Sequence, residues 1–251
     1  MVTQVRAELR KLLGLPTAWA GLIIGTLFAP IIVLINAPAT RRMIEDGALP
    51  GDVADIGLQD LMIGLIGPIV LGVVVVSSEY TSTGDDAPRA RQLTATLTAM
   101  PHRMRLLAAK TVALVIVVFA QATIVAAATL GLTHALLGDY VPVWHAGRIA
   151  AAVLYWVLLA LFSYAITLIA RNGIVPLTLQ IVNSTVVSVS YLLTKLTDLA
   201  NYLPDIVGAH MFLTGSQFEV HIHPVVAGLT MSAWIAALLA IGAYLFQRRD
   251  A

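Results

Sequence analysis

Long apolar runs separated by short polar stretches dominate the chain. A helix that crosses a bilayer needs roughly 20 mostly apolar residues, and the runs between charges provide six candidate spans. The candidate spans cover residues 18–35, 61–78, 111–133, 149–170, 173–193 and 225–246. Helices are expected because a spanning segment must satisfy its own backbone hydrogen bonds, and the alternation typical of a membrane β-barrel is not present. The pattern predicts an all-α integral membrane protein with six transmembrane helices in a single domain, 1–251.

The composition agrees with a membrane protein. Of the 251 residues, 59% are hydrophobic and 12% are charged, and the mean hydropathy is +0.87, whereas a soluble domain carries about 25% charged residues. The net charge of +1 gives no sign of nucleic-acid binding. The chain has no cysteine, which excludes a disulfide framework, a thiolate metal site and a thiol nucleophile.

The basic residues predict the orientation, because Lys and Arg are enriched in cytoplasmic loops. When the N-terminus is placed in the cytoplasm, most of the 15 basic residues lie on the cytoplasmic side, and most of the 14 acids lie outside. The predicted cytoplasmic set is Arg6, Arg10, Lys11, Arg89, Arg91, Arg103, Arg105, Lys110, Arg171, Arg248 and Arg249. Six spans return the C-terminus to the cytoplasm, so we expect both termini there.

The N-terminal stretch TQVRAELRKLLG predicts a short amphipathic helix. Val5, Leu9, Leu12 and Leu13 share one helical face, and the basic residues lie elsewhere. Such a helix fits the membrane interface; the alternative is a charged leader that only orients the first span. We expect the first span to be retained, because its uncharged run is longer than a signal-peptide core of about 7–15 residues.

A polar, net-basic segment, residues 77–110, separates the second and third candidate spans. A turn around residues 84–88 precedes a predicted helix from Arg89 to Met100, which Pro101 ends. This cytoplasmic helix presents Leu97 and Met100 on one side and is suited to docking a soluble partner. The alternative is a solvated loop whose arginines only enforce the topology.

The fifth candidate span is the most polar of the six. Its polar side chains recur at helical spacing and form one stripe. The stripe consists of Gln180, Asn183, Ser184, Ser188 and Tyr191. These residues line a substrate pathway in one interpretation. In the other they hold helices together, as small polar side chains commonly do in membranes.

Motifs for chemistry within the chain are not found. There is no G-x-x-x-x-G-K-[ST] motif to hold ATP, and no H-E-x-x-H motif. No Asp or Glu lies inside a candidate span, which weakens a proton-coupled carrier. His210, His221 and His223 lack the spacing of a metal site, so we expect interfacial histidines and no metal.

Several stretches in the right order resemble the permease subunits of ABC type-2 transporters, particularly an actinobacterial kind. SSEY at the end of the second span is followed by RQLTATLTAMPHRMRLLAAK, which resembles the family's loose pattern T-x-x-L-x-A-x-P-x-R. The matching positions are Glu79, Thr94, Leu97, Ala99, Pro101 and Arg103, then the run from Arg105 to Lys110. Residues 201–204, NYLP, and the ending AYLFQRRDA resemble further family segments. Asp85 and Asp86 replace the family's plain Gly-Thr turn, which leaves the substrate open.

The resemblance implies a mechanism and partners. Two six-span permeases pair, as a homodimer or heterodimer, and each receives a cytoplasmic ATPase subunit that binds ATP and Mg²⁺. The residues implied in coupling are Arg89, Arg91, Leu97, Met100, Pro101 and Arg103. Glu79 is the membrane-interface Glu that closes the second span. The resemblance implies no catalytic residue and no cofactor in this chain.

The expectation is therefore the permease subunit of an ATP-driven exporter in a bacterial plasma membrane. The wide, mostly uncharged interior favours an amphiphilic substrate, such as a drug, a peptide antibiotic or a lipid-like molecule. Two competing hypotheses are a membrane partner of an ATPase that moves no cargo, and a metal-dependent membrane enzyme that uses the outer histidines.

Overall fold

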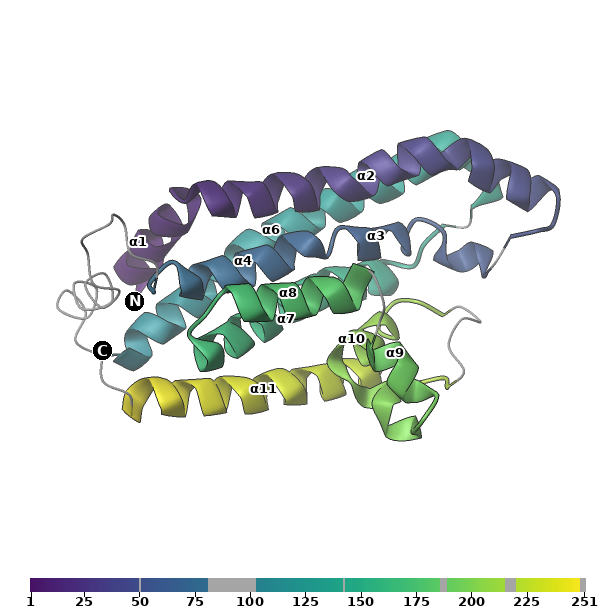
Figure 1. The fold of residues 1–251 in the computed structure, drawn as a ribbon. Helices are drawn as coiled ribbons and strands as arrows, with labels where there is room; N and C mark the ends of the chain where they lie inside the picture. The colour runs from purple at the N-terminus through teal and green to yellow at the C-terminus, as the bar shows by residue number, and fades with distance from the viewer. Residues whose placement is uncertain (50, 81–102, 142, 186–188, 215–219, 249–251) are drawn as a thin grey trace.

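The computed structural model describes residues 1–49, 51–80, 103–141, 143–185, 189–214 and 220–248 (Figure 1). Every regular element in these residues is a helix, as the apolar runs predict. Five helices are long and apolar enough to cross a membrane. They overlap the predicted spans 18–35, 61–78, 111–133, 149–170 and 225–246, so the described residues form an all-helical fold with five candidate membrane spans.

The first two helices follow each other with only a short link. α1 (Val2–Leu13) ends at Gly14, and α2 (Pro16–Glu45) begins with a proline at its first position. Proline fits there because the N–H it lacks would have no partner within the helix. The predicted N-terminal helix is thus confirmed as a helix. α2 extends the first predicted span at its C-terminal end.

The second span is divided, and the third is longer than predicted. A 3-10 turn, η1 (Val53–Asp55), leads to α3 (Asp60–Ile63) and α4 (Ile66–Ser77). α6 (Arg103–Leu137) has 35 residues. At 1.5 Å per residue it measures about 52 Å and exceeds a hydrocarbon core of about 30 Å. α6 therefore begins before the predicted span 111–133 and ends after it.

The remaining helices complete the bundle. The 3-10 turn η2 (Gly138–Tyr140) precedes α7 (Ala146–Ala170), which ends at Arg171 in the left-handed backbone region, with φ 51°. The short elements that follow are α8 (Ile174–Thr185), α9 (Val189–Thr194), η3 (Asp198–Tyr202) and α10 (Pro204–Ala209). The last helix is α11 (Pro224–Arg248).

The predicted fifth span, 173–193, is not one of the five long helices. α8 has 12 residues and α9 has six, and residues 186–188 lie outside the described chain. Five of the six predicted spans are thus helices long and apolar enough to cross a membrane, and six membrane crossings stay a prediction.

The long helices lie side by side in one elongated bundle (Figure 1). α4 packs against α2 and α7, and α7 also packs against α6 and α11. The C-terminal end of α11 lies at the same end of the bundle as α1 (Figure 1). α9, η3 and α10 lie at the opposite end. The core is filled by large side chains of α7 and its neighbours, including Tyr155, Trp156, Tyr164 and Phe212.

Glycines allow α2 and α4 to approach closely. A Cβ atom added to Gly25 of α2 would lie 2.6 Å from the Cα atom of Gly67 of α4. Beside this contact the Gln121 amide Nε2 of α6 donates to the carbonyl oxygens of Gly21 and Leu22 at 3.3 and 3.2 Å. Small residues at helix crossings and interhelical hydrogen bonds are typical of packing in membranes.

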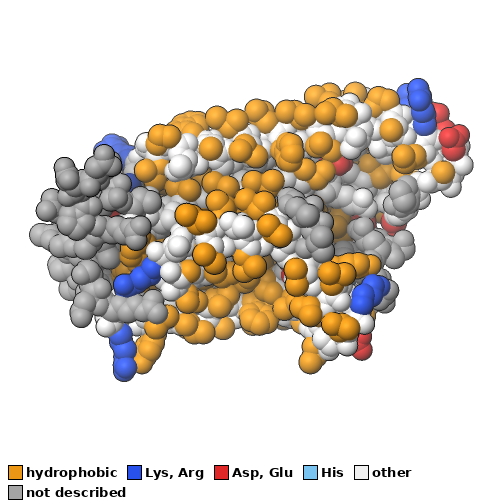
Figure 2. All heavy atoms as spheres, in the orientation of Figure 1, with side chains coloured by type: hydrophobic (Ala, Val, Ile, Leu, Met, Phe, Trp, Pro, Cys, Tyr) orange, Lys and Arg blue, Asp and Glu red, His pale blue; other side chains and the backbone are white. Residues whose placement is uncertain are grey.

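Large apolar side chains also cover much of the outer surface. Hydrophobic side chains extend along the visible face of the bundle, and the Lys and Arg side chains lie towards its two ends (Figure 2). On α2 the exposed set is Trp19, Ile23, Ile24, Leu27, Phe28, Ile31, Leu34 and Ile35. So much exposed apolar surface is what a helix bundle presents to lipid.

Candidate functional site

Four charged side chains from three elements meet at the end of the bundle that holds α1. Lys110 of α6 donates to Glu8 Oε2 at 2.8 Å and to Glu79 Oε1 at 2.6 Å. Lys11 also pairs with Glu79 Oε1. Glu8 and Lys11 belong to α1, and Glu79 lies just after α4. We call Glu8, Lys11, Glu79 and Lys110 the α1 cluster.

The α1 cluster is charge-balanced and largely withdrawn from solvent. The exposed fractions of the side chains are 7% for Glu8, 3% for Glu79 and 7% for Lys110, and 27% for Lys11. A buried charge is costly unless it is paired and hydrogen-bonded. Two carboxylates and two ammonium groups in alternation meet that requirement, so each ion depends on the others.

The charges around Glu79 set the pKa of its carboxyl. Burial acts to raise this pKa, while the charge of Lys110 and the hydrogen bonds from Lys11 and Lys110 act to lower it. The lowering prevails, and the pKa of Glu79 lies below its ordinary value of 4.5. Glu79 is therefore an anion at neutral pH, despite its burial.

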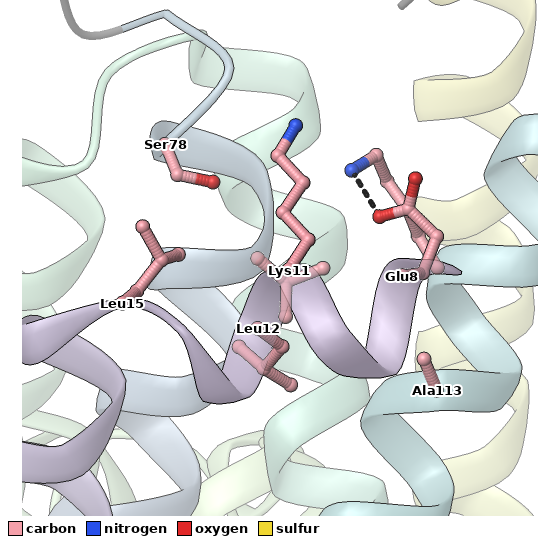
Figure 3. A pocket seen from close by; sticks show the side chains of 8 residues that line it. Glu8, Lys11, Leu12, Leu15, Ser78 and Ala113 are labelled. Carbon is pink, nitrogen blue, oxygen red and sulfur yellow. Dashed lines mark hydrogen bonds and ion pairs between the residues drawn. The ribbon is translucent and has the colours of Figure 1, made fainter. Parts of the chain in front are cut away.

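Two small pockets flank the α1 cluster. One, seen in Figure 3, is lined by cluster residues together with Leu12, Leu15, Val75, Ser78 and Ala113. There Glu8 faces the Lys110 amino group, and the ion pair is drawn as a dashed line. The other pocket is lined by Val76, Tyr80, Leu106, Leu107, Tyr164, Leu168 and Phe246, beside Glu79 and Lys110. Lys110 thus lines both pockets, and Glu79 lines only the second.

The packed face of α1 differs from the predicted one. Val5 and Leu9 are half-buried and Leu12 is buried, as expected, but Leu13 is exposed. Glu8 is buried instead, because α1 packs on α6 and Glu8 finds Lys110 there. The periodic pattern of leucines did not contain this information, since the partner lies 102 residues away.

Most of the residues predicted to couple the chain to an ATPase lie outside the described residues. These are Arg89, Arg91, Leu97, Met100 and Pro101. Arg103 is the first residue of α6. Glu79 is the one predicted functional residue of this region whose side-chain contacts are seen, and it belongs to the α1 cluster.

Two described members of the predicted polar stripe, Gln180 and Asn183, bind neighbouring helices. Gln180 of α8 is buried; its Oε1 accepts from Ser163 Oγ of α7 at 2.6 Å, and its Nε2 donates to the Pro176 carbonyl at 3.2 Å. Asn183 donates to Asp205 Oδ2 at 2.7 Å. These contacts join α8 to α7 and α10.

The other members of the stripe are not gathered with Gln180. Tyr191 of α9 is exposed, with the Lys195 amino group 5.2 Å from its ring centroid. Ser188 lies outside the described residues, and the side chain of Ser184 is likewise not described. The contacts seen are those of helix packing, and a pathway along the stripe stays a prediction.

The histidines do not converge. His210 is buried, with Nδ1 3.0 Å from the Ile206 carbonyl and Nε2 3.0 Å from the Val220 carbonyl. His223 Nδ1 accepts from the Val225 N–H at 3.3 Å. Within the described residues, no group of three or more His, Cys, Asp or Glu side chains is placed to hold a metal ion.

A second charged cluster, at the opposite end of the bundle, was not predicted. The Asp55 carboxylate is fully buried, pairs with Arg148, and accepts from the Thr214 N–H at 3.0 and 3.1 Å and from Thr214 Oγ1 at 3.0 Å. Arg148 also donates to the carbonyls of Ala54 and Phe212, both at 2.9 Å. We call Asp55, Arg148 and Thr214 the α7 cluster.

One feature of the sequence points to the α7 cluster. Arg148 is one of four basic residues on the mostly acidic side of the chain, directly before an apolar span. Such a residue needs an acidic partner, but position alone does not choose among the nine acids on that side: Glu45, Asp46, Asp52, Asp55, Asp60, Asp139, Asp198, Asp205 and Glu219.

No protein-family model matches the chain, and no curated protein matches it. The resemblance to transporter permeases therefore rests on the residues themselves.

Proposed function

We propose that this chain is the membrane permease subunit of an ATP-driven exporter in a bacterial plasma membrane. A separate cytoplasmic ATPase supplies the energy and binds the ATP and Mg²⁺, since this chain has no phosphate-binding loop. Two permeases pair, alike or unlike, and an amphiphilic molecule crosses the membrane between them. The five long apolar helices and their exposed apolar surface support the membrane part of this proposal.

The charge distribution supports an orientation with both termini in the cytoplasm. The end of the bundle that holds α1 carries the basic residues Arg6, Arg10, Arg105, Arg171 and Arg248. Lys and Arg favour the cytoplasmic side of a membrane protein. α7 and α11 both end towards this end of the bundle (Figure 1). Between them the chain must therefore return to the opposite end. α8 and the residues after it make this crossing in the proposal.

The observation that carries the proposal is the α1 cluster. It ties the end of α4 to the first three turns of α6. Glu79 comes two residues after the end of α4, Lys110 lies seven residues after the start of α6, and both are bound by α1. A cytoplasmic ATPase that moves the polar segment between α4 and α6 can move the membrane helices only if the segment is rigidly attached to them.

The proposal is tested by purifying the tagged chain from its native membrane in mild detergent and identifying co-purifying proteins by mass spectrometry. We expect an ATPase with a phosphate-binding loop, and we expect it to be lost in the double variant Met100→Asp/Arg103→Glu. The matched control is Met43→Asp/Arg42→Glu, which makes the same changes at two exposed residues of α2 at the other end. No ATPase in several detergents would overturn the proposal.

The same eluate separates the competing hypotheses. A second, different permease would establish a heterodimer. An ATPase that binds normally while neither Gln180→Ala nor Asn183→Ala changes resistance to amphiphilic compounds would favour a partner that moves no cargo. A metal-dependent enzyme is not favoured, because both ring nitrogens of His210 face backbone carbonyls.

A further inference from the structure

We infer that α1 is a positioning element that fixes the end of α4 relative to the start of α6 through the α1 cluster. The functional part of this inference rests on the proposed function, because the spacing between α4 and α6 positions the segment on which an ATPase would dock. Its structural part does not depend on that function. Glu8 and Lys11 are the positioning residues on α1, and Glu79 and Lys110 are their targets.

The connectivity of the cluster is a closed ring. Glu8 binds Lys110, Lys110 binds Glu79, Glu79 binds Lys11, and Lys11 returns to Glu8 through the backbone of α1. Residues three apart lie on the same side of a helix, so a single face of α1 reaches both targets. α1 therefore contacts both Glu79, just after α4, and Lys110 within α6.

The burial of the ring makes the contact specific. Glu8 is the only acid in the first 44 residues, and its side chain is directed into the bundle, while Arg6 and Arg10 on the same helix are exposed. If α1 were only a charged leader, its acid would have no reason to be buried. The direct bond between Lys110 and Glu79 joins α6 to the end of α4, and α1 reinforces that bond from outside.

Because positive and negative charges alternate in the ring, the removal of one charge affects specific neighbours. Removing the Glu8 charge leaves Lys110 with Glu79 alone, and Glu79 then faces two lysines, so the remaining ions are no longer balanced. The ionic bond between α1 and α6 is lost, while the bonds of Glu79 to Lys110 and to Lys11 persist. Glu8→Gln therefore separates the action of α1 from the integrity of the bundle, which Lys110→Met does not.

The structural part is tested by pulsed electron paramagnetic resonance on the purified full chain. Because the natural chain has no cysteine, spin labels can be placed at Arg6→Cys and Arg105→Cys, both exposed positions on α1 and α6. We expect one narrow distance distribution that broadens with Glu8→Gln. Labels at Arg105→Cys and Arg248→Cys leave α1 out, and their distribution should stay unchanged.

The functional part is tested by the recovery of ATPase from native membrane. We expect Glu8→Gln to lower recovery about tenfold, which corresponds to about 1.4 kcal/mol of binding free energy. Lys110→Arg keeps the charge and should retain both recovery and the narrow distribution. Glu45→Gln is the matched control, since Glu45 is an exposed acid paired with Arg41 at the other end of α2.

Each outcome is decisive. An unchanged distribution between positions 6 and 105 in Glu8→Gln would overturn the positioning role of α1. A broadened distribution with undiminished ATPase recovery would overturn the functional part and leave α1 a structural element. If no ATPase is recovered with the wild type, the proposed function fails, whereas the resonance result still decides whether α1 fixes the spacing.

Discussion

The α1 cluster and the α7 cluster both balance buried charge where separate elements meet, but they use different partners. In the α1 cluster the bonds that join α1, Glu79 and α6 run from one side chain to another. In the α7 cluster Arg148 donates to two backbone carbonyls, and Asp55 accepts from a backbone N–H. The first cluster therefore holds helices together, and the second holds the backbone of the links between helices.

The local backbone explains this difference. Helix interiors satisfy their own N–H and C=O groups, so α1 and α6 offer only side chains to one another. The links around residues 54 and 212–214 have no such ladder, and buried backbone groups there need other partners. Arginine suits that task because its planar guanidinium presents five donors, whereas lysine is a compact charge on a flexible stem.

The largest expected effect is on the α7 cluster. Asp55→Ala leaves the Arg148 guanidinium without its carboxylate and leaves the Thr214 N–H without its acceptor. Breaking a buried ion pair on one side costs about 3–5 kcal/mol. We expect a correspondingly large fall in Tm, measured by tryptophan fluorescence of the detergent-purified chain.

A control and a second variant sharpen this test. Asp139→Ala removes an exposed acid at the same end of the bundle and should change Tm little. Asp55→Leu with Arg148→Met removes both charges and should recover part of the lost stability, since the uncompensated charge is gone. Equal effects of Asp55→Ala and Asp139→Ala would show that the α7 cluster is not a stabilising pair.

The same contrast explains how much the sequence alone could predict. Apolar run length indicated five of the long helices, and periodicity indicated α1, because both depend on neighbouring residues. Neither signal can pair Glu8 with Lys110 or Asp55 with Arg148. Those choices depend on which helices pack together, and single sequences carry no record of that.

The segment after Arg171 was the least predictable part of the fold. Its apolar composition predicts one span, and the described residues there form α8 up to Thr185 and α9 from Val189. The Asn183 side chain accepts from the Ser190 N–H at 3.3 Å and donates to Asp205. These bonds tie α8 to α9 and α10, and hydropathy does not register such contacts.

Exchanging lysine and arginine tests whether the two clusters need different donors. Arg148→Lys keeps the charge but cannot reach Asp55, Ala54 and Phe212 with one planar group. We expect a loss of about 1.5–3 kcal/mol, the range for a hydrogen bond to a charged group. Lys110→Arg should change Tm far less, because its two acceptors are carboxylates that arginine also binds. The comparison fails if Lys110→Arg is the more damaging exchange.

The smallest expected effect is the response of the α1 cluster to acid. Because the folded pKa of Glu79 lies below its ordinary value of 4.5, ionised Glu79 stabilises the fold at every pH above that value. The stabilisation is lost only as the pH falls below 4.5 and through the folded pKa. We expect Glu79→Gln to have a lower Tm than the wild type at neutral pH, and the two Tm values to approach each other on acidification.

The control Asp139→Asn should follow the wild type throughout. A difference between wild type and Glu79→Gln that stays constant down to the lowest pH would mean that the cluster holds α4 to α1 and α6 by shape rather than by charge.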